Sequence, residues 1–282
     1  IFKHFKNKLY KLNMSNYGPN IYSINEKYTP IADIPIAVPV SDQNSNQPHN
    51  HEFTIITAMS PQSIRQSFVS KVYSILWLQL LVTSFFIGCC NKIKPLQNFM
   101  ISDYGNLLMI VSICFMIILT CCMYCIQENL RKSPGNYLYL TVFTISCTYI
   151  LGYVGIAYKL TTLLLAGIST LVIFSGLSLY AIQTKYDYTD KGGYLLAILL
   201  CLCMFGLFIP FTHYSIYSLI YSSIGSLIFS CYIVYDTQLI IGGEHRSIMF
   251  SINDYVIAAV SLYLDIINLF LMLLDLLNGV DR

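Results

Sequence analysis

Residues 255–277 read YVIAAVSLYLDIINLFLMLLDLL, and this stretch decides the fold. About 20 consecutive apolar residues in a helix suffice to cross the hydrocarbon core of a bilayer, and this run is longer than that. Its charged side chains are Asp265, near the middle, and Asp275, near the end. The stretch therefore predicts a transmembrane helix with a carboxyl group deep in the membrane.

Six further apolar runs precede this stretch, and each is long enough to cross a bilayer. Backbone polar groups find no partners in lipid, so only helices and closed barrels span a membrane. The strands of a membrane barrel alternate between apolar and polar residues, whereas these runs are continuously apolar, which favours helices. We therefore predict an all-α fold, a polytopic membrane bundle of seven transmembrane helices. The six runs are Val72–Cys90, Leu107–Ile126, Tyr137–Tyr158, Leu163–Ile182, Tyr194–Phe211 and Ile216–Ile241.

The composition excludes several classes of protein. Of 282 residues, 56% are hydrophobic and 11% are charged, whereas about a quarter of a soluble domain is charged. A net charge of +2 provides no basic field for a nucleic-acid partner. The ten cysteines lie in or beside apolar runs, and we interpret them as small membrane-embedded side chains, not as disulfides or metal ligands. Common catalytic and nucleotide-binding motifs do not occur, so we expect neither an enzyme nor a cofactor.

The chain divides into a polar arm and a membrane domain. Residues up to Ser60 contain five of the nine prolines among many Asn, Gln and Ser residues. Such a composition cannot bury enough apolar surface to fold. We therefore expect residues 1–62 to form a disordered, Pro-rich arm and residues 63–282 to form the membrane domain. Met14 is a candidate native start.

The distribution of Lys and Arg predicts the orientation, because these residues are enriched in cytosolic loops. If the arm is cytosolic, seven of them lie near span ends on the inner side and four lie on the outer side. We therefore expect a cytosolic N-terminus. The inner residues are Arg65, Lys71, Arg131, Lys132, Lys185, Lys191 and Arg246, and the outer residues are Lys92, Lys94, Lys159 and Arg282.

Two aspartates near the cytosolic ends of the last two spans form the candidate site. A carboxyl group deep in a transmembrane helix costs about 2.5–3.5 kcal/mol on insertion scales, so such groups are rare and usually functional. The 13-residue loop between the two spans keeps the helices adjacent and antiparallel. Asp236 and Asp265 then lie at depths that differ by roughly 7 Å. Ser261 and Asn268 form a supporting polar stripe beside Asp265, and Gly225 shares a face with Asp236, as expected of packed interfaces.

Two facing carboxyl groups in a medium of low dielectric constant cannot both ionise cheaply, so they should share one proton and titrate as a unit. The pair is therefore a candidate pH-sensitive latch or ion site. A purely structural hydrogen bond between Asp236 and Asp265 is the alternative. Calcium requires 6–8 oxygen ligands, so the two carboxyl groups would bind Ca²⁺ weakly and transiently at most.

Two other charged residues lie near the ends of predicted spans. Arg131 follows the second span, which ends at the same membrane face as Asp236. Its side chain is therefore a candidate latch for Asp236. An anchor that faces the lipid headgroups is the alternative role for Arg131. Asp275 lies near the end of the last span, where we expect its carboxyl group to be solvated at the interface.

Four blocks of sequence resemble the lifeguard branch of the Bax-inhibitor family, the transmembrane BAX-inhibitor-motif proteins. The similarity runs from about Ser63 to the C-terminus. The blocks, in order, are RQSFVSKVYSILWLQLLVT from Arg65, QTKYDYTDKGG from Gln183, YDTQLIIGG from Tyr235 and DYVIAAVSLYLDIINLF from Asp254.

The resemblance implies a seven-helix protein of the endoplasmic reticulum, the Golgi or another internal membrane. Family members let Ca²⁺ leak from stores and protect cells from programmed death. A di-aspartyl pH sensor described in the family corresponds to Asp236 and Asp265, and a latching arginine on the second helix corresponds to Arg131.

The residues and the resemblance together predict a pH-sensitive Ca²⁺ leak channel that acts in Ca²⁺ homeostasis and negative regulation of apoptosis. Its expected partners are Ca²⁺, protons and membrane lipid. Two alternatives remain open. One is a non-conducting membrane scaffold that binds cell-death regulators, and the other is a proton-coupled cation transporter.

Overall fold

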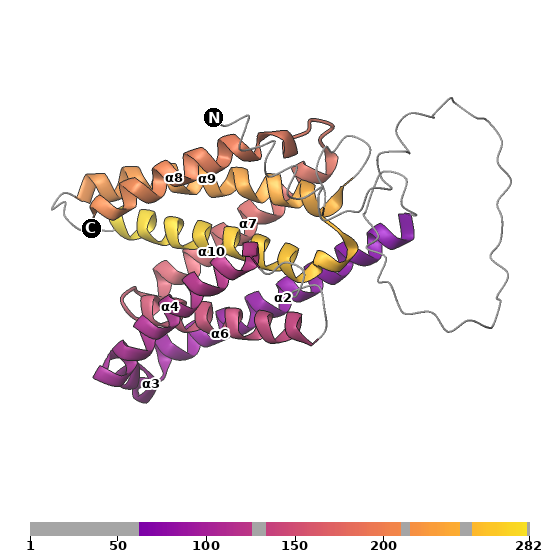
Figure 1. The fold of residues 1–282 in the computed structure, drawn as a ribbon. Helices are drawn as coiled ribbons and strands as arrows, with labels where there is room; N and C mark the ends of the chain where they lie inside the picture. Colours follow the sequence, from indigo (N-terminus) through magenta and orange to yellow (C-terminus); the bar gives the residue numbers. More distant parts are fainter. Residues whose placement is uncertain (1–61, 126–133, 210–214, 243–249, 281–282) are drawn as a thin grey trace, which may run out of the picture. The chain divides into compact units, whose positions relative to one another are not determined.

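The structure, a computed structural model, describes residues 62–125, 134–209, 215–242 and 250–280. Almost all of this part of the chain is helical (Figure 1). The helices are α2 (Gln62–Lys92), α3 (Lys94–Ile101), α4 (Asp103–Cys125), α6 (Gly135–Ile156), α7 (Leu160–Gln183), α8 (Gly192–Phe208), α9 (Ser215–Ile241) and α10 (Tyr255–Val280). Short 3-10 turns, η2 (Thr189–Lys191) and η4 (Ile252–Asp254), precede α8 and α10.

The described residues contain seven helices that are long and apolar enough to cross a membrane, which confirms the predicted seven-helix membrane fold. The protein is therefore a multi-pass membrane protein. Each predicted run lies within or largely overlaps one of these helices. The expected arm lies outside the described residues, apart from Gln62, which is the first residue of α2.

Two differences from the prediction concern the region around the first span. α2 begins ten residues before Val72, the predicted start. These added turns are helical because Phe68, which is 3% exposed, packs into the same core as Val72. The short helix α3 was not predicted. It begins beside Pro95, a residue suited to the first turn of a helix, and it buries Met100.

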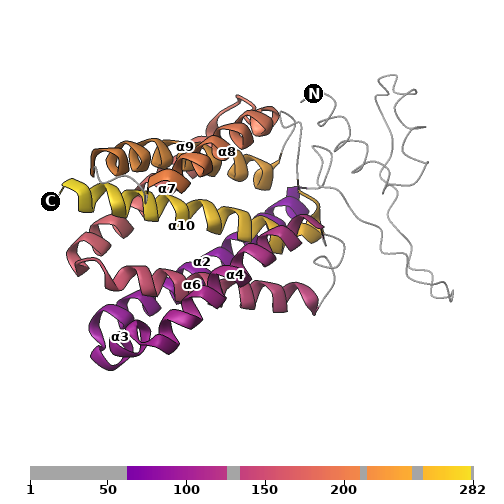
Figure 2. The ribbon, with the colours of Figure 1, turned by 60° about the vertical axis from the view of Figure 1, so that its left-hand side comes forward.

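Helix α10 lies at the centre of the bundle. It packs against α9, α2, α7 and α6, and both views show it between the α8–α9 pair and the α2–α6 pair (Figures 1 and 2). More than half of its most apolar segment is buried by protein, whereas α4 and α8 leave nearly all of theirs exposed. The apolar outer faces of α4 and α8 therefore suit contact with lipid, and α10 is shielded from it.

Small residues allow α10 its central position. Ala258 and Ala259 are fully buried, so neighbouring helices approach the α10 backbone from more than one side. Nine of the ten cysteines are free thiols in the described helices. The core therefore depends on helix packing without covalent cross-links among the described residues.

Candidate functional site between helices α9 and α10

The structure brings Asp236 of α9 and Asp265 of α10 together inside the bundle. Their carboxyl groups are hydrogen-bonded to one another. Both residues are buried, with 6% and 7% of their surfaces exposed. A hydrogen bond between two carboxyl groups requires one of them to carry a proton. The arrangement is therefore suited to the sharing of one proton between two helices.

Few other groups near the pair offset the cost of burying two carboxyl groups. Among the described residues, the other carboxyl group is the one charged group that acts on either aspartate. The Oδ2 atom of Asp265 is buried and finds no conventional donor in this part of the chain. A buried carboxyl oxygen without a donor is costly, so the site favours a proton, a water molecule or a cation beside it.

The predicted supporting residues lie on the same helix as Asp265. Ser261 and Asn268 are half-buried. The amide of Asn268 donates to the carbonyl oxygen of Leu264 at 2.8 Å, one turn earlier on α10, so this amide is bonded within its own helix. Arg131, the predicted latch, lies outside the described residues, and its role stays a prediction.

Three buried hydroxyl groups converge next to this pair, and sequence reasoning missed them. The hydroxyl of Tyr73 on α2 approaches those of Ser178 on α7 and Thr237 on α9. None of the three oxygen atoms has a well-formed hydrogen bond among the described residues. Thr237 directly follows Asp236, and this adjacency in the sequence could have indicated a hydroxyl group near the pair. Hydroxyl residues are ordinary in membrane helices, so the convergence of three required the tertiary structure.

A second polar cluster lies on another face of α10, because Tyr263 comes two residues before Asp265 on the helix. The hydroxyl of Tyr263 is 2.8 Å from that of Thr83 on α2. Thr83 also lies 3.0 Å from the hydroxyl of Thr148 on α6. One turn away, the amide of Gln79 donates to Thr144 at 2.9 Å. Hydrogen-bonding groups therefore line the interior of the bundle where α2, α6 and α10 meet.

The expectation that Asp275 is solvated at the membrane interface is wrong. Asp275 is half-buried, and its Oδ2 atom accepts hydrogen bonds from the hydroxyls of Ser218 and Ser222 on α9. The two serines are one turn apart near the start of α9, and the antiparallel partner brings its last turns to them. Asp275 therefore joins α9 and α10 at the end of their interface opposite to the carboxyl pair.

The oxygen atoms at the carboxyl pair do not make a closed metal site. Among the described residues, no group of three or more His, Cys, Asp or Glu side chains could hold a metal ion. Two carboxyl groups with nearby hydroxyls provide fewer charged ligands than tight Ca²⁺ sites use.

Comparison with known proteins shows the family of the chain. Residues 65–282 match the family model described as inhibitor of apoptosis-promoting Bax1. The chain belongs to the Bax-inhibitor family. Within this family it is 34% identical over 219 residues to protein lifeguard 4 of Mus musculus. The alignment covers 78% of this chain and 87% of that protein. It is 28% identical over 221 residues to protein lifeguard 3 of Homo sapiens, and this alignment covers 77% of this chain and 70% of that protein.

These relatives confirm the predicted lifeguard branch of the Bax-inhibitor family. The matched region begins at Arg65, just inside α2, and contains both aspartates of the buried pair. The chain is therefore a membrane protein of a family implicated in the regulation of apoptosis.

Proposed function

We propose that this Bax-inhibitor protein is a pH-sensitive Ca²⁺ leak pathway of an intracellular membrane, where it contributes to Ca²⁺ homeostasis and to negative regulation of apoptosis. One observation carries the proposal: Asp236 and Asp265 share a hydrogen bond while buried between two transmembrane helices. Intramembrane carboxyl groups of this kind usually belong to ion or proton pathways.

The shared proton provides the pH sensitivity. Loss of this proton leaves two negative charges in contact in a medium of low dielectric constant, which is unfavourable. The repulsion favours separation of α9 and α10, or entry of a cation whose charge replaces the proton. A divalent cation would balance both charges, and the hydroxyls of Tyr73, Ser178 and Thr237 offer further oxygen atoms nearby. Weak ligation suits conduction, because an ion must also leave.

The setting of this activity is also a proposal. The excess of Lys and Arg on one side of the predicted spans supports a cytosolic N-terminus. The endoplasmic reticulum or the Golgi would supply the Ca²⁺ gradient that a leak requires. The link to apoptosis follows from the family description, inhibitor of apoptosis-promoting Bax1. This role requires no enzymatic step and no cofactor.

The test is Ca²⁺ flux from proteoliposomes that contain the full chain, measured over a range of pH. We expect Asp236→Asn and Asp265→Asn each to abolish the pH dependence, because an amide cannot ionise. Asp103→Asn is the matched control, since Asp103 is an exposed carboxyl residue at the start of α4. The control should keep the wild-type profile.

Other outcomes would assign a different function. No flux above that of protein-free vesicles would contradict the leak pathway and favour a scaffold that binds cell-death regulators. Flux that saturates with Ca²⁺ and follows an imposed proton gradient would favour a proton-coupled transporter. An unchanged pH dependence in both aspartate variants would remove the pair from the mechanism.

A further inference from the structure

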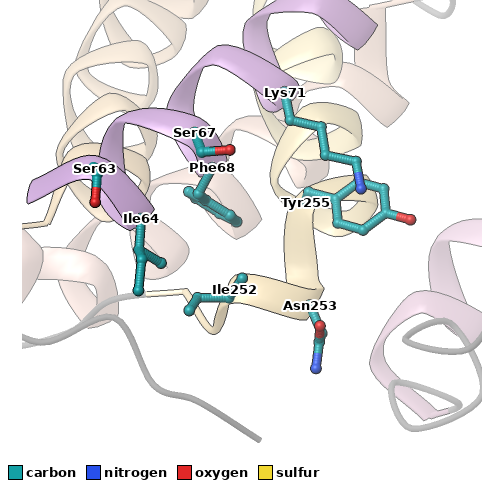
Figure 3. A pocket seen from close by; sticks show the side chains of 8 residues that line it. All are labelled: Ser63, Ile64, Ser67, Phe68, Lys71, Ile252, Asn253 and Tyr255. Atoms are coloured by element: carbon teal, nitrogen blue, oxygen red, sulfur yellow. The ribbon is translucent and has the colours of Figure 1, made fainter. Parts of the chain in front are cut away.

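A groove of about 370 Å³ lies where the first turns of α2 meet η4 and the start of α10 (Figure 3). It lies near the predicted inner end of the bundle, away from the interior polar groups described above. One side of the groove is formed by α2 and the other by residues 252–255. None of the residues that line the groove belongs to the carboxyl pair or to the three hydroxyl groups beside it.

The α2 side of the groove combines a polar row with an apolar row. Ser63, Ser67 and Lys71 are spaced four residues apart, so they lie along one line of the helix. Ile64 and Phe68 form the neighbouring row and give the groove an apolar floor. All five side chains are shown at the groove in Figure 3. A cation and two hydroxyls therefore border an apolar surface.

Lys71 provides the charge of the groove. Its Nζ atom lies 3.4 Å above the centre of the Tyr255 ring. The side chain is exposed, and no carboxylate among the described residues lies within salt-bridge distance of it. Asp254, beside Tyr255, instead accepts a hydrogen bond from the backbone of Ser251 in a capping box. An anion could therefore approach the ammonium group without displacing a carboxylate.

The position of the groove along α2 places it at the level of the lipid headgroups. Lys71 and Lys92 are both exposed and lie 21 residues apart on this helix. A helix rises 1.5 Å per residue, so the two ammonium groups are separated by about 32 Å along the axis. This length matches the hydrocarbon core, which is about 30 Å thick. With Lys92 at one boundary, Lys71 lies at the other, and Ser63 and Ser67 reach beyond it.

We propose that this groove binds an anionic phospholipid of the surrounding bilayer. The phosphate lies against the Lys71 ammonium group and accepts hydrogen bonds from the hydroxyls of Ser63 and Ser67. The glycerol covers Phe68 at the level of the headgroups, and the acyl chains run inward from there along α2 toward the centre of the bilayer. The groove lies at the depth of the headgroups, where the lipids of the membrane are already present. A lipid is therefore favoured over a soluble anion as its ligand.

The groove also touches the helix that carries the carboxyl pair. Tyr255, which forms part of its wall, is the first residue of α10. Its hydroxyl accepts a hydrogen bond from the Asn136 amide at 2.7 Å, so the same residue is tied to α6. A lipid in the groove would therefore contact a junction of α2, α6 and α10.

Fluorescence of Trp77 tests the proposal in the full chain. Trp77 is the single tryptophan, lies six residues after Lys71 on α2, and is 61% exposed. The protein is reconstituted in phosphatidylcholine bilayers, and quenching by brominated phosphatidylserine is compared with quenching by brominated phosphatidylcholine. We expect the wild-type protein to prefer phosphatidylserine. The preference should fall about fivefold in Lys71→Gln, the loss expected for one basic residue near a membrane surface.

Three further variants distinguish binding in the groove from a general effect of an exposed lysine. Lys159→Gln removes an exposed lysine that precedes α7, and it should leave the preference unchanged. Lys71→Arg should keep it. Ser67→Phe should abolish it by filling the groove while Lys71 remains, and Ser67 is exposed, so folding should not suffer.

Three results would overturn the proposal. The first is equal quenching of the wild-type protein by the two lipids. The second is an equal effect of the Lys71→Gln and Lys159→Gln changes. The third is displacement of the brominated lipid by soluble glycerophosphoserine at similar concentration, which would assign the groove to free anions.

Discussion

Gly225 of α9 lies directly against Met272 of α10, and a Cβ atom on the glycine would be 2.6 Å from the methionine sulfur. Asp236 lies eleven residues later on α9, which is close to three helical turns, so it faces α10 as Gly225 does. The close approach at the glycine therefore helps to hold α9 near α10 where the two carboxyl groups meet.

A larger side chain at Gly225 should push these helices apart. We expect Gly225→Val to destabilise the protein by about 1–3 kcal/mol, the usual cost of overpacking. Thermal unfolding in detergent measures this change, and the Ca²⁺ leak of the variant should increase. Gly176→Val is the matched control, because nothing lies within 4 Å of a Cβ atom at Gly176 on α7. Equal melting temperatures for the two variants would contradict the prediction.

The bond between Asp275 and α9 should contribute to stability. Ser222 is 1% exposed, and Ser222→Ala removes one of two hydroxyl donors to the Asp275 carboxyl group. We expect a loss of about 1–3 kcal/mol in unfolding free energy, because the acceptor stays half-buried. The control is Ser223→Ala, since the Ser223 hydroxyl bonds to the Leu219 carbonyl of its own helix. If Ser223→Ala is as destabilising, the bond between the helices is not responsible.

The hydroxyl of Tyr263 should stabilise the bundle independently of its ring. Tyr263 is fully buried and bonds to Thr83. Tyr263→Phe keeps the ring but leaves the threonine hydroxyl with one fewer partner, so we expect a loss of about 1–2 kcal/mol in unfolding free energy. Tyr194→Phe, at a position that is 74% exposed, should change the melting temperature little. No difference between the two variants would show that the bond contributes nothing net.

The sign of the pH effect follows from the shared proton. The contact between Asp236 and Asp265 requires that proton, so rising pH should weaken the α9–α10 interface and increase Ca²⁺ flux in proteoliposomes. Asp265→Asn keeps a donor that cannot ionise, and its flux should stay at the level of the protonated protein at every pH. A wild-type flux that falls as pH rises would contradict this sign.

Much of the fold was predictable because the length of an apolar run is a local property. The described residues confirm seven membrane-spanning helices, and the depth of Asp236 and Asp265 could be counted from the ends of their runs. The short loop between α9 and α10 indicated that these helices are neighbours. The first turns of α2 were missed because their sequence is mixed, and burial of Phe68 stabilises them.

The sequence by itself determined the membrane environment, the number of spans and the rarity of deep carboxyl groups, since each depends on residues next to one another in the chain. The tertiary structure alone decided which distant polar groups meet. Thr83 and Tyr263 are 180 residues apart, and Asp275 lies 53 residues from Ser222. Their contacts depend on the relative rotation and vertical offset of packed helices, and no local pattern of residues encodes either quantity.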